Sequence, residues 1–415
     1  MATPLGDSYA CPPGSYIAAG RFAGKSGRIV VAGDSLTDMA GSFAGYRWGL
    51  PLIGSPLLIN YNAGVFSNTV QDLIDRWETT VLAYSPDIVM IRIGTNSTNV
   101  PQATYQSQYD WLINSLLTNN IFGVFHAVPP KIGTLVPRAM SDYLATKCAE
   151  HHGKLLFIDD SVDLGYADYS YNPAYFIGDG VHMSDLGEYS QGKRMADVLR
   201  NVFAKLDPLC KDGTDTYASN PASNQYVKNP LFAGSGGTLS EVTGVAPNFW
   251  TVAKSGAGTA ITSSLVSADS GDPNQAPWLR LTPTSTGGDG HEISIYTDLG
   301  HPAFLADMSD VKRFDLVTEC RLNDCDGSVW KNIEQQCTYG ANYIGPASGF
   351  GMVGCGTVSE RLVLRTSLSR DFKQAAVAVP ANAARYLIRF TFQAASSGNV
   401  GSVDLRCASV RGLQT

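Results

Sequence analysis

A serine at position 35, in the segment GRIVVAGDSLTD (residues 27–38), is the strongest candidate nucleophile in the sequence. A serine hydroxyl attacks a carbonyl efficiently only when a base accepts its proton and N–H donors hold the oxyanion. Ser35 follows the apolar run Ile29–Ala32 after Gly33 and Asp34, which places it at the carboxyl end of a buried-type strand, where open α/β folds hold their sites. The tripeptide GDS also occurs at Gly6-Asp7-Ser8, but no strand pattern precedes Ser8 and two prolines follow it, so we assign it no catalytic role.

The base for Ser35 must come from one of six histidines, and we predict His182. Asp179 precedes His182 by three residues in a glycine-containing loop, just before a helical pattern that begins near Ser184. A carboxylate so placed can hold one imidazole nitrogen while the other faces the serine. The remaining histidines fit other roles, in the core, at a helix end or in the second half of the chain: His126, His151, His152, His291 and His301.

Donors for the oxyanion are expected at the ends of two further strands. Gly64 can offer a backbone N–H at close approach because it lacks a side chain, and Asn96 can offer its amide. With the Ser35 N–H they make three candidate donors around one point. Each has an ordinary alternative, since glycines turn chains and asparagines cap helices.

Alternating short apolar runs and helical patterns position these residues. The runs are Arg28–Gly33, Pro56–Asn60, Asp87–Ile93, Ile121–Val128 and Lys154–Asp159. Between them lie amphipathic stretches, one of which starts at the expected N-cap Asn68. Strands that alternate with helices predict a parallel sheet covered on both faces, an α/β fold.

The pattern changes near residue 207. We expect an N-terminal extension over residues 1–26, a catalytic α/β domain over 27–206, a linker over 207–224 and an all-β domain over 225–415. The linker is rich in Pro, Gly, Ser, Thr, Asn and Asp, and the segments after it alternate like those of an antiparallel sandwich. These segments are Asn248–Ala253, Trp278–Leu281, Glu292–Tyr296, Leu362–Thr366, Tyr386–Phe392 and Val403–Val410.

Four segments, in order, resemble the blocks of the SGNH, or GDSL-type, hydrolase family: Gly33-Asp34-Ser35-Leu36, Gly64, Gly94-Thr95-Asn96 and Asp179-Gly180-Val181-His182. The resemblance implies a flavodoxin-like α/β/α fold that hydrolyses esters, with Ser35 as nucleophile, His182 as general base and then acid, and Asp179 orienting His182. It also implies an oxyanion hole made of the Ser35 and Gly64 N–H groups and the Asn96 amide, with no metal and no organic cofactor.

Two positions depart from the family's usual pattern. The third block often ends in Asp, where this chain has Ser97, and the second block often carries another glycine, where this chain has Ser67. Neither change removes a group from the expected mechanism, so we expect them to act on loop shape and substrate choice.

Composition narrows the function classes. The 415-residue chain has a net charge of −7, which argues against a nucleic-acid binder. We find no membrane span and no secretory signal. Eight cysteines are too few for a disulfide scaffold, and no CxxC pair indicates zinc. Five cysteines fall in the last hundred residues, where one or two bridges would fit: Cys320, Cys325, Cys337, Cys355 and Cys407.

We expect the substrate to be an acetylated polysaccharide. The family includes lipases, thioesterases and carbohydrate deacetylases, and the chain lacks the long apolar insertion that a lipase lid would need. Asn172–Ile177, just before the catalytic loop, is a candidate lining for a small pocket. Four aromatic residues suit stacking on sugars, although core packing is their commoner fate: Tyr46, Trp48, Tyr105 and Tyr109.

The second half resembles, in composition, the jelly-roll sandwiches of carbohydrate-binding and phage tail proteins. Tethering an esterase to a glycan-binding module raises its effective concentration on the polymer. We therefore expect an extracellular or virion-associated O-acetyl esterase, and a homotrimer if it is a phage tail component. The alternatives are a short-chain carboxylesterase or lipase of the same family, and a non-catalytic glycan-binding structural protein.

Overall fold

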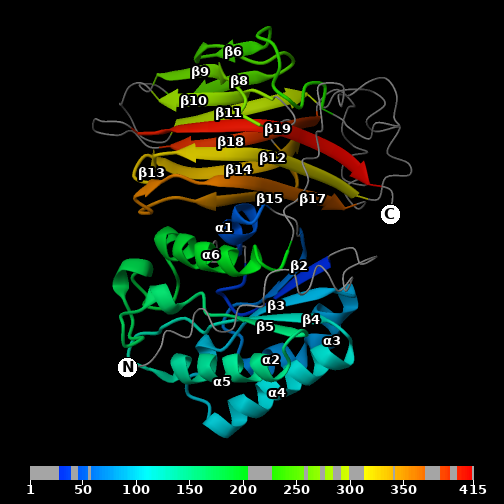
Figure 1. Ribbon diagram of the computed structural model, residues 1–415, viewed down its shortest axis with the longest axis vertical. Coiled ribbons are helices and arrows are strands. Elements are labelled where there is room, and N and C mark those ends of the chain that lie inside the picture. The colour runs from blue at the N-terminus through cyan, green and yellow to red at the C-terminus, as the bar shows by residue number, and fades with distance from the viewer. Residues whose placement is uncertain are drawn as a thin grey trace. The chain divides into compact units, whose positions relative to one another are not determined.

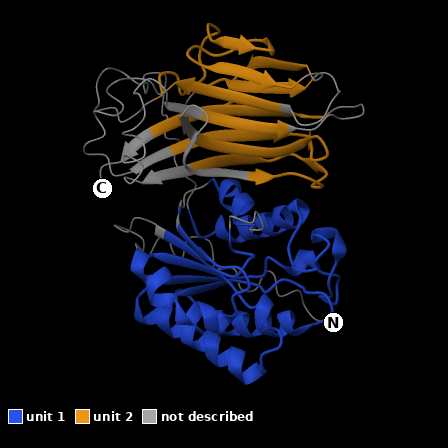
Figure 2. Ribbon diagram, turned by 180° about the vertical axis from the view of Figure 1, so that it is seen from behind, with its two compact units in different colours: residues 1–205 blue, residues 206–415 orange. Residues whose placement is uncertain are grey.

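The computed structural model describes residues 28–38, 45–54, 58–203, 227–256, 260–271, 276–283, 291–298, 313–339, 342–369, 384–392 and 400–413. The expected N-terminal extension with Ser8, the expected linker and His301 lie outside the described residues. The chain divides into two compact units, residues 1–205 and 206–415 (Figure 2), and each is described by itself.

Five parallel strands form the sheet of the first unit, in the order β2-β1-β3-β4-β5. Their bounds are β1 Arg28–Gly33, β2 Leu58–Gly64, β3 Ile88–Arg92, β4 Phe122–His126 and β5 Leu155–Ile158. The predicted strands agree with these except the second, which begins later than expected and continues to Gly64. The strand order reverses between β1 and β3, the kind of position where doubly wound sheets bind ligands.

Helices cover both faces of this sheet, as predicted. Figure 1 shows α2, α3, α4 and α5 on one face and α1 and α6 on the other. Their bounds are α1 Tyr46–Leu52, α2 Val70–Asp75, α3 Trp77–Thr80, α4 Gln102–Thr118, α5 Val136–Glu150 and α6 Asp185–Leu199.

The helix starts follow local capping chemistry. Helix α6 begins near Ser184, as predicted, and Ser184 caps it by accepting a hydrogen bond from the Gly187 N–H. The cap of α2 is Thr69 rather than the expected Asn68, because Thr69 and Asp72 satisfy each other's backbone N–H groups in a capping box. Asn68 instead accepts a hydrogen bond from Arg76.

The two faces of the sheet differ in chemistry because side chains alternate along each strand. The face toward α2–α5 is a continuous apolar core. The opposite face is apolar at the start of the strands and polar at their carboxyl ends, where Arg92 of β3, His126 of β4 and Asp160 after β5 are buried. The polar end of this face lies next to the turn that carries Ser35, since the Thr37 hydroxyl donates to the Arg92 carbonyl.

Two six-stranded sheets form the second unit, in the orders β17-β12-β19-β10-β9-β7 and β15-β14-β18-β11-β8-β6 (Figure 1). Buried Gln335 of β14 donates to the Leu316 carbonyl of β12, which ties one sheet to the other. The strands are β6 Thr238–Ser240, β7 Thr243–Gly244, β8 Thr251–Ser255, β9 Ile261–Val266, β10 Trp278–Pro283, β11 His291–Asp298, β12 Arg313–Asn323, β14 Trp330–Tyr339, β15 Asn342–Gly351, β17 Arg361–Ser369, β18 Ala384–Phe392 and β19 Ser402–Leu413, with a separate pair β13 Cys325–Asp326 and β16 Thr357–Val358.

The β-rich character of this half was predicted, but its pairing is not purely antiparallel. Short β6 and β7 pair parallel to β8 and β9, so both sheets are mixed. The sequence pattern also missed β12, β14 and β15, whose charged outward residues and glycines conceal the alternation.

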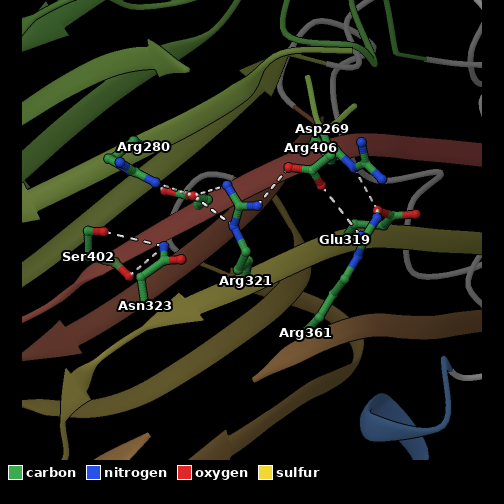
Figure 3. Close-up of polar contacts among 9 residues, drawn as sticks. Asp269, Arg280, Glu319, Arg321, Asn323, Arg361, Ser402 and Arg406 are labelled. Carbon is green, nitrogen blue, oxygen red and sulfur yellow. Dashed lines mark hydrogen bonds and ion pairs between the residues drawn. The ribbon is translucent and has the colours of Figure 1, made fainter. Parts of the chain in front are cut away.

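An ion-pair chain lies on the outward side chains of the first of these sheets (Figure 3). Asp404 of β19 takes paired hydrogen bonds from Arg280 of β10 and from Arg321 of β12. The chain continues through Asp269, Arg361, Glu319 and Arg406, so that four arginines alternate with three carboxylates. Burial alone would raise the pKa of Asp404, but the hydrogen bonds from Arg280 and Arg321 outweigh it and hold that pKa below its ordinary value.

Candidate active site

Ser35 lies in a tight turn directly after β1. The N–H groups of Thr37 and Asp38 donate to the Asp34 carbonyl, and the Leu36 N–H donates to the Asp34 carboxylate at 3.0 Å. Gly33 is required before this turn, because a Cβ there would lie 1.9 Å from the Arg92 carbonyl oxygen. Ser35 itself is only 5 % exposed. The sheet therefore fixes the nucleophile candidate in a narrow, nearly buried position.

The structure brings His182 and Asp179, the two residues predicted to act with Ser35, together at the Ser35 hydroxyl. His182 Nε2 lies 2.8 Å from Ser35 Oγ, and His182 Nδ1 lies 2.6 Å from Asp179 Oδ2. The other Asp179 oxygen accepts from the N–H groups of Val181 and His182, which closes the loop upon itself. Burial would raise the pKa of Asp179, but these hydrogen bonds from His182 and Val181 outweigh it and lower that pKa. Asp179 is thus held as a carboxylate that orients the imidazole.

Asn96 lies in the 3-10 helix Thr95–Ser97 that follows β3. Gly94 enters this helix with a φ of +134°, a conformation that strongly favours glycine. One Asn96 amide hydrogen is used at 3.1 Å by the Asn68 carbonyl, which leaves the second N–H of the group for another acceptor. The structure thus brings Asn96 against the turn Val65–Asn68 that follows β2.

Gly64 has a different partner from the one predicted. Its N–H donates to the Asn62 side-chain oxygen at 2.8 Å, so in this structure it does not point to a substrate. The glycine is still needed, because a Cβ at this position would lie 2.4 Å from the Asp38 N atom in the nucleophile turn. Three residues later, Ser67 adopts a φ of +61°, and no described residue accepts a hydrogen bond from its N–H. The sequence singled out Ser67 only as a departure from the family pattern.

Comparison with known families identifies this arrangement. Residues 31–188 match the model of the GDSL-like lipase/acylhydrolase family. This segment of the first unit is similar to that family. The matched segment contains the Ser35 turn, Asn96 and the loop of Asp179 and His182. No curated protein matches the chain.

Solved structures similar to the chain include a protein of the G-D-S-L family from Desulfitobacterium hafniense, at 23 % identity and a TM-score of 0.37, with 42 % of this chain and 100 % of that one covered. A lipase/acylhydrolase from Enterococcus faecalis has 20 % identity and a TM-score of 0.36, covering 43 % and 98 %. A variant of an acetyl xylan esterase from Geobacillus stearothermophilus has 23 % identity and a TM-score of 0.35, covering 44 % and 97 %.

The first unit also buries a polar cluster that the sequence did not indicate. Arg92 Nη2 lies 2.5 Å from Asp160 Oδ2, and His126 Nδ1 lies 2.7 Å from the same oxygen. Glu188 and Gln191 of α6 are buried on this side of the sheet as well. We call these five residues the buried polar cluster. His126 was expected in the core, which is where it lies, but Arg92 and Asp160 sit in strand patterns that look apolar.

Several atoms of the buried polar cluster have no hydrogen-bond partner among the residues that the structure describes. These are Arg92 Nε and Nη1, His126 Nε2, Asp160 Oδ1, both carboxyl oxygens of Glu188 and both amide atoms of Gln191. Buried polar atoms of this kind are paired by water or by rearrangement, or else they cost stability. The cluster is therefore only partly satisfied by protein groups.

Burial sets the ionisation of the acidic groups near the nucleophile. It raises the pKa of Glu188 to about 8, so that this side chain is neutral at pH 7. It raises the pKa of Asp34 to about 6, against the lowering effects of the Leu36 N–H, Arg92 and His182. Asp160 differs: burial would raise its pKa, but Arg92 and His126 together lower it.

The aromatic residues expected to stack on sugars are core residues. All four are buried, and the Tyr109 hydroxyl donates to the Ile93 carbonyl. Tyr46 packs edge-on against His126, and Trp48 packs on α6 against Tyr189. The prediction that they stack on sugars was wrong, because helical spacing places them on the covered faces of α1 and α4. The four residues are Tyr46, Trp48, Tyr105 and Tyr109.

Other candidate groups can be stated briefly. Within the described ranges, no three His, Cys, Asp or Glu side chains gather in a way that would hold a metal ion. No disulfide joins the cysteines whose side chains are described, which are Cys148, Cys320, Cys325, Cys355 and Cys407. Among the helices that the structure describes, none is long and apolar enough to span a membrane.

Proposed function

We propose that the protein is a serine esterase that removes O-acetyl or other short acyl groups from a polysaccharide. The observation that carries the proposal is the hydrogen-bonded line from Ser35 through His182 to Asp179, at 2.8 and 2.6 Å. A nucleophile, a base and an orienting carboxylate within hydrogen-bond reach are the parts that acyl transfer requires. The similarity of their segment to the GDSL-like family supports an ester as the substrate.

In the proposed mechanism, Ser35 Oγ attacks the ester carbonyl carbon while His182 Nε2 accepts the hydroxyl proton. The tetrahedral intermediate collapses, the carbon–oxygen bond to the alcohol breaks, and His182 gives that proton to the leaving oxygen. Water then attacks the acyl-serine with His182 again as base, and the acid leaves as Ser35 regains its proton. Asp179 keeps the imidazole oriented and stabilises its charged form.

The oxyanion donors in this proposal are the Ser35 N–H, the Asn96 amide and the Ser67 N–H. Ser67 takes the part expected of Gly64, because the Gly64 N–H is engaged by Asn62. Its turn is next to Asn96, which donates to the carbonyl of Asn68. Three preorganised donors are worth more in a nearly buried site than in water, and losing one typically costs ~3–4 kcal/mol.

The preference for a short acyl group rests on the nucleophile's surroundings. Ser35 is nearly buried, and the turn that holds it packs closely on Gly64 and on the Arg92 backbone. The acyl side of the substrate must fit beside this turn. We therefore propose an acetyl group there and assign the polymer to the alcohol side.

For the second unit we propose a jelly-roll, carbohydrate-binding role. Its two stacked sheets and its Gly-, Ser- and Thr-rich sequence support this. Such a unit would raise the concentration of the esterase on its polymer. We further propose an extracellular or virion-associated protein, and a homotrimer if it is part of a phage tail.

Hydrolysis of p-nitrophenyl acetate by the wild type and by Ser35→Ala tests the proposed enzyme. We expect the substitution to reduce kcat by at least ~10³. Equal rates would leave the non-catalytic glycan-binding alternative. Acetate release from an acetylated polysaccharide, compared with hydrolysis of octanoyl and longer esters, tests the substrate; a preference for the long acyl chains would favour the lipase alternative.

A further inference from the structure

Large apolar side chains that are exposed in the first unit gather on the loops around Ser35. Among its described residues, five of eight such side chains come from loops that contact Asn96, its neighbour Thr95 or the loop of Asp179 and His182. These five are Val65, Phe66, Ile132, Leu135 and Ile177. Exposed apolar side chains that gather at one place commonly mark a binding surface.

Three of them lie directly against the catalytic histidine's loop. The Phe66 ring centroid is 6.3 Å from that of His182. The Ile177 N–H donates to the His182 carbonyl at 2.8 Å, and the Ile132 side chain lies against Gly180, 3.0 Å from where a Cβ would be. The exposed fraction is 49 % for Phe66, 60 % for Ile132 and 40 % for Ile177. We call Phe66, Ile132 and Ile177 the apolar platform.

The chemistry assigns a direction to this platform. His182 must give its proton to the leaving oxygen, so the alcohol part of the substrate must pass within hydrogen-bond reach of His182 Nε2. The acyl part lies on the other side of the carbonyl carbon, beside Ser35 and Asn96. A surface built on Phe66 and on the loop of His182 therefore flanks the alcohol and not the acyl group.

We propose that the apolar platform is the binding subsite for the leaving alcohol, and that it takes the C–H face of an acetylated pyranose ring. The inference rests on the proposed esterase function and specifies its substrate. A pyranose has an apolar face and a hydroxylated edge. Phe66 offers a ring to cover the face, while the partly exposed carboxylate of Asp179 and the Lys131 ammonium, which donates to the Thr95 carbonyl, lie at the edge of the same loops.

An alkyl alcohol fits this surface less well. The three side chains come from three separate loops and are each open to solvent, so they do not enclose a bound molecule along its length. A long chain is bound by enclosing its length. A bound alkyl chain would also displace water from the polar groups at the edge of the platform, and it offers them no hydrogen bonds in return.

The test compares kcat and KM of the full-length protein on three acetates: methyl acetate, methyl tetra-O-acetyl-glucopyranoside and octyl acetate. We expect Phe66→Ala to raise KM for the glucopyranoside about 5- to 10-fold, as for loss of one aromatic contact, with kcat changed less than about twofold. Methyl acetate has no ring to stack and should be hydrolysed as by the wild type. Phe66→Tyr should restore the low KM.

Trp111→Ala is the matched control, because Trp111 is an aromatic residue of α4 with a similar exposure of 41 %. Trp111→Ala should leave kcat and KM unchanged for both methyl acetate and the glucopyranoside. A thermal melt shows whether each variant is folded. The inference is overturned if Phe66→Ala raises KM equally for methyl acetate and the glucopyranoside, or if it raises KM for neither. It is also overturned if the largest increase in KM is for octyl acetate. Ser35→Ala separates the two proposals. If Ser35→Ala still hydrolyses the acetates, the proposed esterase function is wrong. If Ser35→Ala is inactive but Phe66→Ala behaves as the wild type does, only the proposal for the apolar platform is wrong.

Discussion

Two groups of charged side chains, one in each unit, show how differently the protein treats buried polarity. In the ion-pair chain of the second unit, each of three carboxylates is shared by two arginines (Figure 3). In the buried polar cluster of the first unit, Arg92 and His126 share one oxygen of Asp160, and many neighbouring polar atoms have no hydrogen-bond partner in the described part of the chain. As far as the described residues extend, each carboxylate of the first group is paired, whereas the second group is only partly paired.

The difference follows from position. The ion-pair chain lies on the outer side of a sheet, where Arg280 and Arg361 still reach solvent and pay only part of the cost of desolvation. The buried polar cluster lies between a sheet and two helices, next to the turn of the nucleophile, where each unpaired atom costs stability. Proteins retain destabilising groups of this kind mainly at functional sites. The buried polar cluster lies beside Ser35.

Asp179→Asn should give the largest effect, and it separates a carboxylate used in catalysis from one used for stability. We expect kcat on p-nitrophenyl acetate to fall by ~10³- to 10⁴-fold, since the amide no longer holds the correct imidazole tautomer. Asp269→Asn in the ion-pair chain is the control and should leave kcat within about twofold. A similar loss of kcat in both variants would contradict the distinction between a catalytic carboxylate in the first unit and a stabilising one in the second.

Glu188→Gln should make the folded protein more stable in alkaline solution. Because the folded-state pKa of Glu188 is raised to about 8, the folded protein holds the proton more tightly than the unfolded chain. That contribution is complete below pH ~4.5 and is lost as pH rises through about 8. The glutamine variant does not titrate, so its advantage over the wild type should grow across this range, toward about 4–5 kcal/mol at most, at ~1.4 kcal/mol per pKa unit.

Urea denaturation of the first unit at several pH values measures this advantage. Glu150→Gln, at an exposed position on α5, is the matched control. A constant difference between Glu188→Gln and the wild type from pH 5 to 9 would contradict a raised pKa for Glu188.

Arg92→Met should destabilise the first unit by about 3–5 kcal/mol, since it leaves the buried carboxylate of Asp160 without its main partner. The double variant Arg92→Met/Asp160→Leu should recover much of this loss, because it removes the uncompensated charge. Chemical denaturation followed by tryptophan fluorescence measures both. If the double variant is as unstable as Arg92→Met, shape rather than charge explains the loss.

Arg280→Met should have the smallest effect, about 0.5–1 kcal/mol on the second unit, because Asp404 keeps its two hydrogen bonds from Arg321. The loss should shrink in 1 M salt, where exposed charges are screened. An effect as large as that of Arg92→Met would show that the ion-pair chain is not redundant.

The sequence predicted what depends on local pattern. Ser35, Asn96 and the Asp179–His182 pair were predicted as site residues because each follows a strand or precedes a helix, and parallel strands bring their carboxyl ends to one edge. The start of the last helix near Ser184 was predicted because the helical pattern that follows it is local. The α/β sheet and a β-rich second half followed from the same kind of pattern.

What the sequence did not predict depends on contacts between distant residues. Arg92 and Asp160 looked like the ends of ordinary strands, and only the register of β3, β4 and β5 brings them to His126. The partner of the Gly64 N–H is set by the rotamer of Asn62, which no spacing reveals. Tyr46 and Trp48 looked available to a ligand because the pattern does not show that α6 covers them. A signal was present at Arg92, a charge inside an apolar run.

The position of β19 has a consequence for the order of events during folding. This strand, Ser402–Leu413, lies in the interior of its sheet between β10 and β12, and it supplies Asp404 to arginines 124 and 83 residues earlier. Contacts of such separation form slowly, because a long loop must close first. The sheet cannot be completed on a ribosome until residue 413 has emerged, so β10 and β12 must each wait with an unpaired edge, and that interval is when this unit is most exposed to aggregation.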